Sequence, residues 1–406
     1  MKKSLIALAV MAAAGAASAQ SSVNLFGIVD ATISHYQGGG QSNTILTNSG
    51  YNSSRLGFRG TEDLGGGMAA SFWLEAGLNN DNGSNGTTNT NNTLGGSSGG
   101  GGLTFGRRST VSLSGGWGEL RLGRDYVPTF WNITVFDPFG TNGVGAALTH
   151  KVKLANGSTG VLAPGYASVV DGNYVRANNM VQYFLPANLG GFYGQVSYAF
   201  DESTINDAGR YWGGRIGFAS GPFNIAAAYG HTDGGTNSGA TAGGTTGYPA
   251  VTAGVFPANA TEATSPIPDV RNWNLGGQWD FGVAKLLGSI DSARYNGDVG
   301  GENTLKSYTI GVLVPVGAGE IRASYSRAKL NTDAGDDPRS TQYAIGYVHN
   351  LSKRTAVYAT YAHVANKDGA DLPANASIGY ASSTGAMAGR VNSSSNGFDL
   401  GIRHSF

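Results

Sequence analysis

Arginine side chains are the groups in this sequence whose types and spacing could do chemistry. In the segment SRLGFRG, apolar Leu56 and Phe58 alternate with other residues, so Arg55 and Arg59 share the opposite face of an extended chain. The segment YVRANNMVQY likewise sets Arg176 opposite an apolar face. Guanidinium groups keep their charge even beside other cations, so a row of them can select ions and orient dipolar solutes. These segments therefore place several guanidinium groups on the face opposite the apolar one, where they could act on charged solutes if that face lines water.

Other candidates for bond-making chemistry or metal binding do not form the necessary patterns. The six histidines include no pair spaced as H-x-x-x-H. The chain has no cysteine, which excludes a thiolate metal site, a cysteine nucleophile and a disulfide scaffold. An enzyme would need a serine–histidine–acid or acid–histidine cluster, whereas the serines here are typical of polar loops. We therefore expect no enzyme, no cofactor and no metal site.

Alternating hydropathy predicts the elements that must position the arginines. In GFYGQVSYAF, Phe192, Val196, Tyr198 and Phe200 lie on one face, with polar side chains on the other. The segments FNIAAAYG, NWNLGGQWDF and QYAIGYVH share this period of two. Such alternation over about ten residues is typical of a strand whose two faces meet different solvents.

Short turns and long polar loops alternate between these segments. Sixteen strands are predicted, starting near residues 23, 52, 68, 103, 117, 173, 191, 210, 222, 270, 283, 304, 318, 340, 354 and 395. A secreted β-sandwich is the alternative, but its strands average about five or six residues and seldom number sixteen. Lipid cannot satisfy the polar groups of an open sheet edge, so we expect a closed, all-β, antiparallel transmembrane β-barrel whose last strand pairs with its first.

The first residues predict export. MKKSLIALAVMAAAGAASA has two lysines, a short apolar run and small residues at Ala17 and Ala19, which is typical of a signal peptide over residues 1–19. Residues 20–406 would then form a single barrel domain. The equal numbers of basic and acidic residues, 26 of each, give no excess of positive charge of the kind that indicates nucleic-acid binding.

Four segments together resemble one protein family. SRLGFRGTEDLGGG, GWGELRLGRDYVPTF, DPFG and the closing GIRHSF are similar to the trimeric general porins of Gram-negative outer membranes, in their β-proteobacterial form. The resemblance implies a multi-pass barrel in the cell outer membrane, a homotrimer in contact with membrane lipid and lipopolysaccharide, and passive diffusion of small hydrophilic solutes and ions. It also implies that Phe406, on the closing strand, is a signal to the barrel-assembly machinery.

The resemblance places the pore constriction in the third long loop, Val127–Gly172. This loop begins with an apolar, aromatic run and carries Asp137, so packing against the inner barrel wall suits it better than exposure to water. Opposite the loop, the family carries a ladder of arginines. Arg55 and Arg176 match ladder positions, and Arg59 is a neighbour of the ladder.

In FGRRSTVSL the two lines of argument disagree, because the family match favours Arg107 and alternation favours Arg108, so both remain candidates. By alternation, more basic than acidic residues face the lumen, which favours a weak anion preference. The basic residues are Arg55, Arg59, Arg121, Arg176, Arg215, Arg322 and Arg403, and the acidic ones are Asp30, Glu75, Asp280, Asp291 and Asp399.

Three further hypotheses stay open. A substrate-specific channel for a small organic acid or sugar is the alternative function. Asp333, Asp336 and Asp337 in NTDAGDDPR could bind Ca²⁺ or divalent ions that bridge lipopolysaccharide, although a solvated acidic loop is the simpler interpretation. The small outer faces of VDATISHY and STVSLSG fit packing on another subunit, and the loop Leu78–Gly102 could contact a neighbour.

Overall fold

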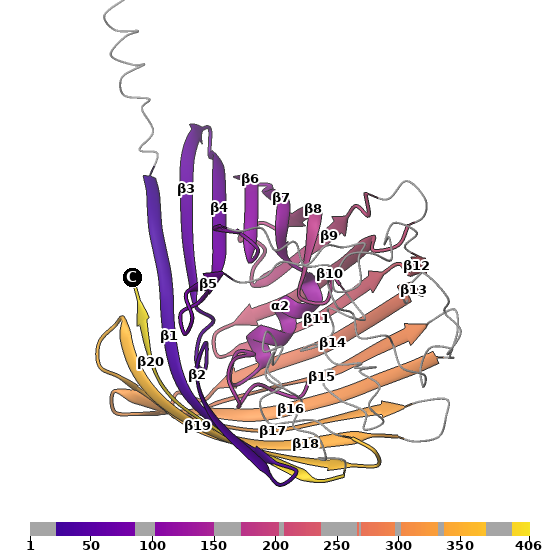
Figure 1. Ribbon diagram of the computed structural model, residues 1–406. Coiled ribbons are helices and arrows are strands. Elements are labelled where there is room, and N and C mark those ends of the chain that lie inside the picture. The colour runs from indigo at the N-terminus through magenta and orange to yellow at the C-terminus, as the bar shows by residue number, and fades with distance from the viewer. Residues whose placement is uncertain are drawn as a thin grey trace, which may run out of the picture.

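The computed structural model (Figure 1) describes residues 22–85, 102–149, 172–202, 207–236, 266–267, 269–296, 302–331, 337–370 and 392–406. The predicted signal peptide and two of the candidate calcium ligands, Asp333 and Asp336, lie outside these ranges. Within the same ranges, no helix is long and apolar enough to span a membrane.

Sixteen long strands form one closed antiparallel barrel. They are β1 (Ser22–Gly38), β3 (Arg55–Gly65), β4 (Met68–Asn79), β6 (Arg108–Gly115), β7 (Gly118–Tyr126), β8 (Arg176–Phe184), β9 (Phe192–Ala199), β10 (Tyr211–Ser220), β11 (Phe223–Thr232), β14 (Asp269–Asp280), β15 (Lys285–Asn296), β16 (Glu302–Val316), β17 (Gly319–Asn331), β18 (Arg339–Asn350), β19 (Thr355–Lys367) and β20 (Ser394–Ser405). The predicted fold class is confirmed, and the predicted strand starts lie within five residues of the observed ones.

Other elements are shorter. The described residues also form β2 (Gln41–Asn48), β5 (Ser84–Asn85), β12 (Gly235–Thr236), β13 (Pro266–Ile267) and the helix α2 (Pro128–Phe136). β2 was not predicted. It forms a hairpin with the far end of β1, in which Gly39 and Gly40 take positive φ angles of 58° and 75° at the turn. Six of the eight residues in QSNTILTN are polar, so this strand has little apolar alternation to reveal it.

The barrel closes between the first and last strands, as predicted. β1 pairs with β20 over the register Ile28↔Ser405 to Gly38↔Ser395, and the beginning of β1 pairs with β3. Phe406 continues this seam, because its backbone N–H donates to the carbonyl oxygen of Gly27 at 3.1 Å and its carbonyl accepts the N–H of Gly27 at 3.1 Å.

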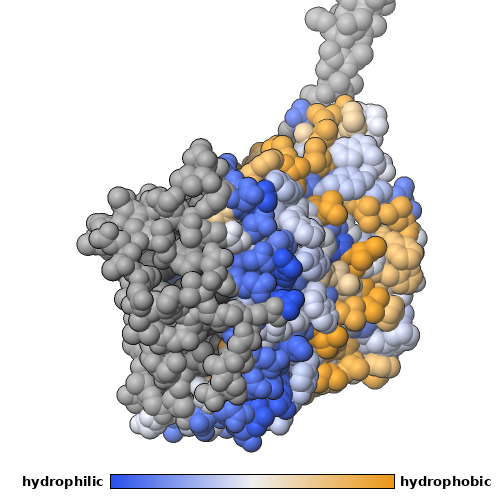
Figure 2. Space-filling model, turned by 90° about the vertical axis from the view of Figure 1, so that its right-hand side faces the viewer, coloured by the Kyte–Doolittle hydropathy of each residue, from blue (hydrophilic) through white to orange (hydrophobic). Residues whose placement is uncertain are grey.

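The two faces of the barrel wall have the opposite polarity to a water-soluble sheet. Apolar Val196, Ile216 and Leu275 are exposed on the outside, whereas polar Asn274 and Ser326 are buried on the inside. Figure 2 shows hydrophobic residues gathered on the outer surface, next to a hydrophilic band. A wide apolar outer surface indicates contact with a second apolar phase, so the outside of the wall suits lipid and the inside suits water.

Candidate functional site in the barrel lumen

The segment after β7 folds into the barrel, as its apolar residues predicted. Figure 1 shows α2 inside the ring of strands. Asn132 joins this helix to the wall: its side-chain amide donates to the carbonyl oxygen of Ala226 at 2.9 Å and to Oδ1 of Asn274 at 2.7 Å. Its own oxygen accepts Nε of Arg215 at 2.8 Å. Because these polar groups are buried, the bonds between them fix the position of the helix.

Inward-facing glycines give the segment room to lie against the wall. On β14, a Cβ at Gly276 would overlap the ring of Phe136, which is fully buried. On β16, a Cβ at Gly311 would overlap the ring of Pro138. The absence of side chains at these positions therefore lets the segment pack directly on the backbone of the barrel.

The far end of the segment bonds to β17 and to β20, which closes the barrel with β1. The N–H of Leu148 donates to Oγ of Ser326 on β17 at 3.0 Å. The N–H of Val144 donates to Oδ2 of Asp399 on β20 at 2.9 Å, and Oδ1 of the same carboxylate accepts the hydroxyl of Ser34 on β1 at 2.6 Å. Residues 127–149 thus contact the inner wall from β10 round to β20 and narrow the lumen.

Asp137 was expected to point the loop's negative charge into the pore, and the structure places it differently. Its side chain is only 6% exposed, and its carboxylate accepts the backbone N–H groups of Phe139 at 2.9 Å, Thr141 at 3.0 Å and Ala147 at 3.0 Å. A buried carboxylate is stabilised by such donors. Asp137 therefore closes the loop on itself, and the acid that meets Arg55 and Arg107 is Glu75.

Three of the predicted arginines meet around Glu75 and Tyr126. Oε1 of Glu75 lies 2.6 Å from Nε of Arg107 and 3.3 Å from a terminal nitrogen of Arg55. The guanidinium of Arg176 lies 4.3 Å from the centre of the Tyr126 ring, whose hydroxyl accepts from Arg107 at 3.3 Å. This group carries a formal charge of +2, from three guanidinium groups and one carboxylate. We call these five residues the arginine cluster.

Both Arg107 and Arg108 reach the lumen, although strict alternation allowed only one. Arg107 precedes β6 and is free of the alternation of the strand, whereas Arg108 is its first residue. Nε of Arg108 lies 3.4 Å from a carboxylate oxygen of Asp125, and its guanidinium lies 4.5 Å from the Trp73 ring. Arg59 lies over the same ring at 5.1 Å, further along the wall from the arginine cluster.

Aromatic rings also support arginines elsewhere on the inner wall. Stacking holds the plane of a guanidinium group while leaving several N–H donors for water or solute. Sequence reasoning did not find this role for the rings, because alternation gives the face of each residue but not its contacts. The further pairs are Arg121 on Phe184 at 4.0 Å, Arg215 on Tyr193 at 4.9 Å, and Arg322 and Arg403 on Tyr51 at 4.6 Å and 5.3 Å.

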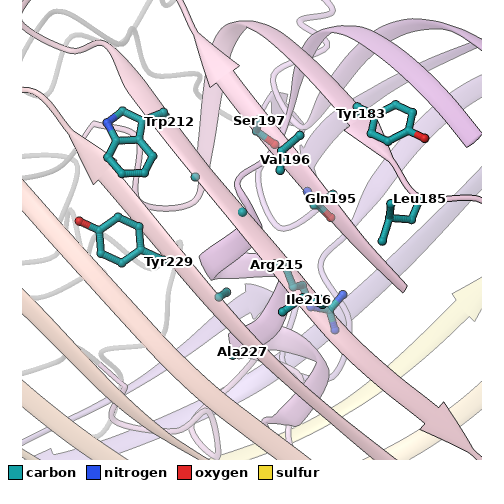
Figure 3. Close-up of a pocket in the computed structure, with 13 residues that line it drawn as sticks. Tyr183, Leu185, Gln195, Val196, Ser197, Trp212, Arg215, Ile216, Ala227 and Tyr229 are labelled. Carbon is teal, nitrogen blue, oxygen red and sulfur yellow. The ribbon is translucent and has the colours of Figure 1, made fainter. Parts of the chain in front are cut away.

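A groove on the barrel is separate from the lumen. Figure 3 shows its lining on neighbouring strands, including Val196, Trp212, Ile216 and Tyr229. These four side chains are exposed on the outside of the wall, and the groove forms where Gly214 leaves a gap among them. The lining is mainly apolar, so this hollow suits lipid chains and is not part of the solute path.

One group of potential metal ligands lies at the rim of the barrel. His231, Asp233 and Asp269 bring ligand atoms within 4.8 Å of one another. Both carboxylates already contact arginines, with Asp233 2.5 Å from Nε of Arg210 and Asp269 3.1 Å from Nε of Arg271. The guanidinium groups thus balance the charge that would otherwise attract a cation.

Comparison with known sequences agrees with the barrel and its lumen. A family model described as Gram-negative porin matches residues 5–369. The chain is 40% identical over 413 residues to outer membrane porin protein 32 of Delftia acidovorans, with 100% of both chains covered. It is 29% identical over 425 residues to an outer membrane porin protein of Bordetella pertussis, covering 90% of this chain and 95% of that one.

Comparison with solved structures gives the same answer. The anion-selective porin from Comamonas acidovorans superposes with a TM-score of 0.72 at 35% identity, covering 95% of this chain and 100% of the other. OmpT of Vibrio cholerae, in a trimer form, shares the fold with a TM-score of 0.59 at 16% identity over 95% of this chain and 99% of that one. With its closed barrel, polar lumen and full-length relatives, this chain belongs to the Gram-negative porin family and is a diffusion channel of the cell outer membrane.

Proposed function

We propose that the pore is weakly anion-selective, with its narrowest part between residues 127–149 and the arginine cluster, and that solutes cross it unchanged. The observation that carries this proposal is the excess of positive charge at Arg55, Arg107 and Arg176 over the single carboxylate of Glu75. An anion passing these groups meets an attractive potential, whereas a cation meets a repulsive one. The relative described as an anion-selective porin supports this sign.

The remaining lumen charges leave the excess in place. Arg121 contacts both Glu119 and Asp125, and Arg322 contacts Glu320, so these groups are largely balanced. Several of the predicted lumen acids are also withdrawn from the water path. Asp30, Asp291 and Asp399 are each at most 3% exposed.

The zero-current potential of the purified protein in planar bilayers tests this proposal. With a salt gradient across the membrane, the sign of the potential gives the preferred ion directly. Fixed positive charges on the wall predict a zero-current potential whose sign indicates anion preference and whose size decreases as the salt concentration rises. It decreases because the Debye length falls from about 10 Å at 0.1 M to about 3 Å at 1 M. A potential of the cation sign contradicts the assignment.

A specific channel for a small organic acid is the second candidate. The observation that favours it is the stacking of Arg322 and Arg403 on Tyr51, which presents fixed guanidinium donors of the kind that bind carboxylates. Conductance measured with rising concentrations of succinate and of glucose separates the two functions. If one of the two solutes blocks the current in a saturable way, the result supports a specific channel. If the current stays proportional to salt concentration in the presence of either solute, the result supports general diffusion.

We also propose a homotrimer whose contacts include the outer faces of β1, β6 and β7. Side chains there are aliphatic or small, whereas the outer faces of β9 to β18 carry many aromatic rings, which suit the lipid interface. The trimer form of OmpT supports the same assembly. The β1, β6 and β7 residues concerned are Val29, Ala31, Ile33, Ser109, Val111, Leu113, Leu120 and Leu122. A mass measurement in mild detergent that gives only a monomer contradicts this.

Phe406 is our candidate for the signal read by the barrel-assembly machinery. Its ring lies on the outer face, where it covers Gly27 of β1, and it is 42% exposed. A partner reaching the closing strand from the membrane can therefore touch this ring without entering the lumen. Contact of the outer wall with lipid and lipopolysaccharide belongs to the same proposal.

A further inference from the structure

The short connection between β2 and β3, residues 49–54, is held in place by a buried carboxylate. Asp30 of β1 is fully buried, and its Oδ2 accepts the backbone N–H groups of Tyr51 at 2.9 Å and Asn52 at 2.6 Å. Its Oδ1 accepts the hydroxyl of Tyr358, which is also buried. Because both oxygens of Asp30 have donors inside the wall, this carboxylate determines where Tyr51 lies.

The ring of Tyr51 lies over two arginines of the inner wall. The guanidinium of Arg322 on β17 is 4.6 Å from the centre of the ring, and that of Arg403 on β20 is 5.3 Å from it. The Tyr51 hydroxyl also accepts from Arg322 at 3.1 Å. Both arginines face the lumen, because their chain neighbours Ile321 and Ile402 are exposed on the outside. Tyr51 is itself only partly buried, so its ring lines the lumen.

The same connection meets the arginine cluster. Nε of Arg55, the cluster residue on β3, donates to the carbonyl oxygen of Ser53 at 2.9 Å. Ser53 is two residues from Tyr51, so the connection lies between Arg55 on one side and Arg322 and Arg403 on the other. The basic lining of the lumen therefore continues from the arginine cluster past the seam to β17.

The connection also touches the loop that narrows the lumen. The hydroxyl of Ser53 donates to Oδ1 of Asn142 at 2.7 Å. A Cβ at Gly143 would overlap the carbonyl oxygen of Gly50, and Gly143 has a φ of 63°, which side chains rarely adopt. The two backbones are thus in direct contact, and a displacement of residues 49–54 would displace the loop as well.

We infer that residues 49–54 form part of the constriction and that Tyr51 sets both the bore and the selectivity of the pore. This inference rests on the proposed function and adds another side to the narrow part, beside the loop and the arginine cluster. The Tyr51 ring occupies space in the lumen and keeps passing ions close to the guanidinium groups. Coulomb attraction weakens with distance and with intervening water, so a wider bore selects ions less strongly. Asp30 is a positioning residue that acts through Tyr51.

Single-channel recording in planar bilayers tests the role of the ring. Tyr51→Ala is expected to raise the conductance and to lower the anion-to-cation permeability ratio by roughly twofold. Tyr51→Phe keeps the ring and should conduct like wild type. The matched control is Tyr343→Ala, which removes a 56% exposed ring from the outer face and should leave both quantities unchanged. Equal conductance of Tyr51→Ala and Tyr343→Ala overturns the inference.

Two variants of Asp30 test the positioning role. Asp30→Ala removes both acceptors and is expected to raise the conductance as Tyr51→Ala does. Asp30→Asn keeps one oxygen for the N–H groups of Tyr51 and Asn52, while its amide donates to the hydroxyl of Tyr358, so we expect wild-type conductance. Wild-type conductance of Asp30→Ala contradicts the positioning role, and so does an equally raised conductance in Asp30→Asn.

Uptake of neutral sugars of increasing size by liposomes that contain the protein measures the bore without reference to charge. Tyr51→Ala is expected to admit larger sugars than wild type and Tyr343→Ala, and an equal size limit for all three overturns the inference. The sign of the wild-type zero-current potential tests the proposed anion preference separately. A cation-selective wild type with a wider bore in Tyr51→Ala would contradict the proposed function and leave the assignment of Tyr51 to the constriction standing.

Discussion

Nε of Arg107 lies 2.6 Å from Oε1 of Glu75, so the arginine cluster has its one carboxylate at its centre. Replacing Glu75 by Gln keeps the shape of this group and raises its formal charge from +2 to +3, counted from the same residues. We expect stronger anion preference, by a screened contribution of about 0.5–1 kcal/mol or roughly a two- to fivefold change in permeability ratio. Zero-current potentials in dilute salt measure the permeability ratio of anions to cations. A shift of this potential toward cation preference in the variant contradicts the prediction.

The opposite change removes positive charge from the same place. In the double variant Arg55→Ser/Arg176→Ser the zero-current potential is expected to move toward cations. Because exposed charges are screened, the shift should become small as the Debye length falls to about 3 Å at 1 M salt. A wild-type potential for this variant in dilute salt would mean that these two arginines do not line the constriction.

Gly276 and Gly277 form a matched pair of positions on β14. Gly276 faces inward, where a Cβ would overlap Phe136, whereas a Cβ at Gly277 meets only ordinary contacts at 3.6 Å or more. Gly276→Val is therefore expected to displace α2, at a cost of about 1–3 kcal/mol from overpacking, and to change single-channel conductance. Gly277→Val is the control and should conduct like wild type. Equal conductance of the two variants would show that α2 does not form part of the constriction.

Asp137 is expected to affect the stability of the loop more than the selectivity of the pore. In Asp137→Asn an amide replaces a carboxylate that accepts three backbone N–H groups, so at least one buried donor loses its partner. The loss costs about 1–3 kcal/mol, and we expect noisier single-channel current with little change in zero-current potential. Asp207→Asn, at a 64% exposed side chain, is the control. A large shift of the zero-current potential toward anion selectivity, with no added noise in the single-channel current, would show that Asp137 lines the pore.

Phe406 is expected to matter for assembly and not for conduction. Phe406→Ala removes a ring on the outer face and no group in the lumen. The amount of folded protein in the outer membrane should fall, while molecules that do assemble keep wild-type conductance. Phe398→Ala, which removes an exposed ring from the same strand, controls for the loss of apolar surface alone. Equal yields for the two variants would argue against a signal at Phe406.

Alternation predicted most of the barrel because each strand separates two solvents along its whole length. It gave the inward faces of Arg55, Arg59 and Arg176 and the outward face of Phe406. Alternation could not decide where a strand begins. It therefore allowed only one of the consecutive residues Arg107 and Arg108 to face the lumen, although both reach it because Arg107 precedes the strand.

The contacts of the loop could not be predicted from local patterns. Whether Asp137 faces water or its own backbone depends on how residues 137–147 fold, and the partner of Val144 is 255 positions away in the sequence. The glycines that receive the loop are equally hidden, because Gly276 and Gly277 look alike until α2 is seen on one side of the strand.

The carboxylate of Asp399 has a consequence for the order of folding. It accepts Ser34 from β1 and Val144 from the loop, and Ser34 and Asp399 are register partners across the seam. The complete acceptor site for Val144 therefore exists only after the first and last strands have paired. Asn132 can hold α2 to the wall before this pairing, but the far end of the loop gains its anchor only at closure. An assembly intermediate arrested just before closure should therefore pass larger solutes than the mature protein.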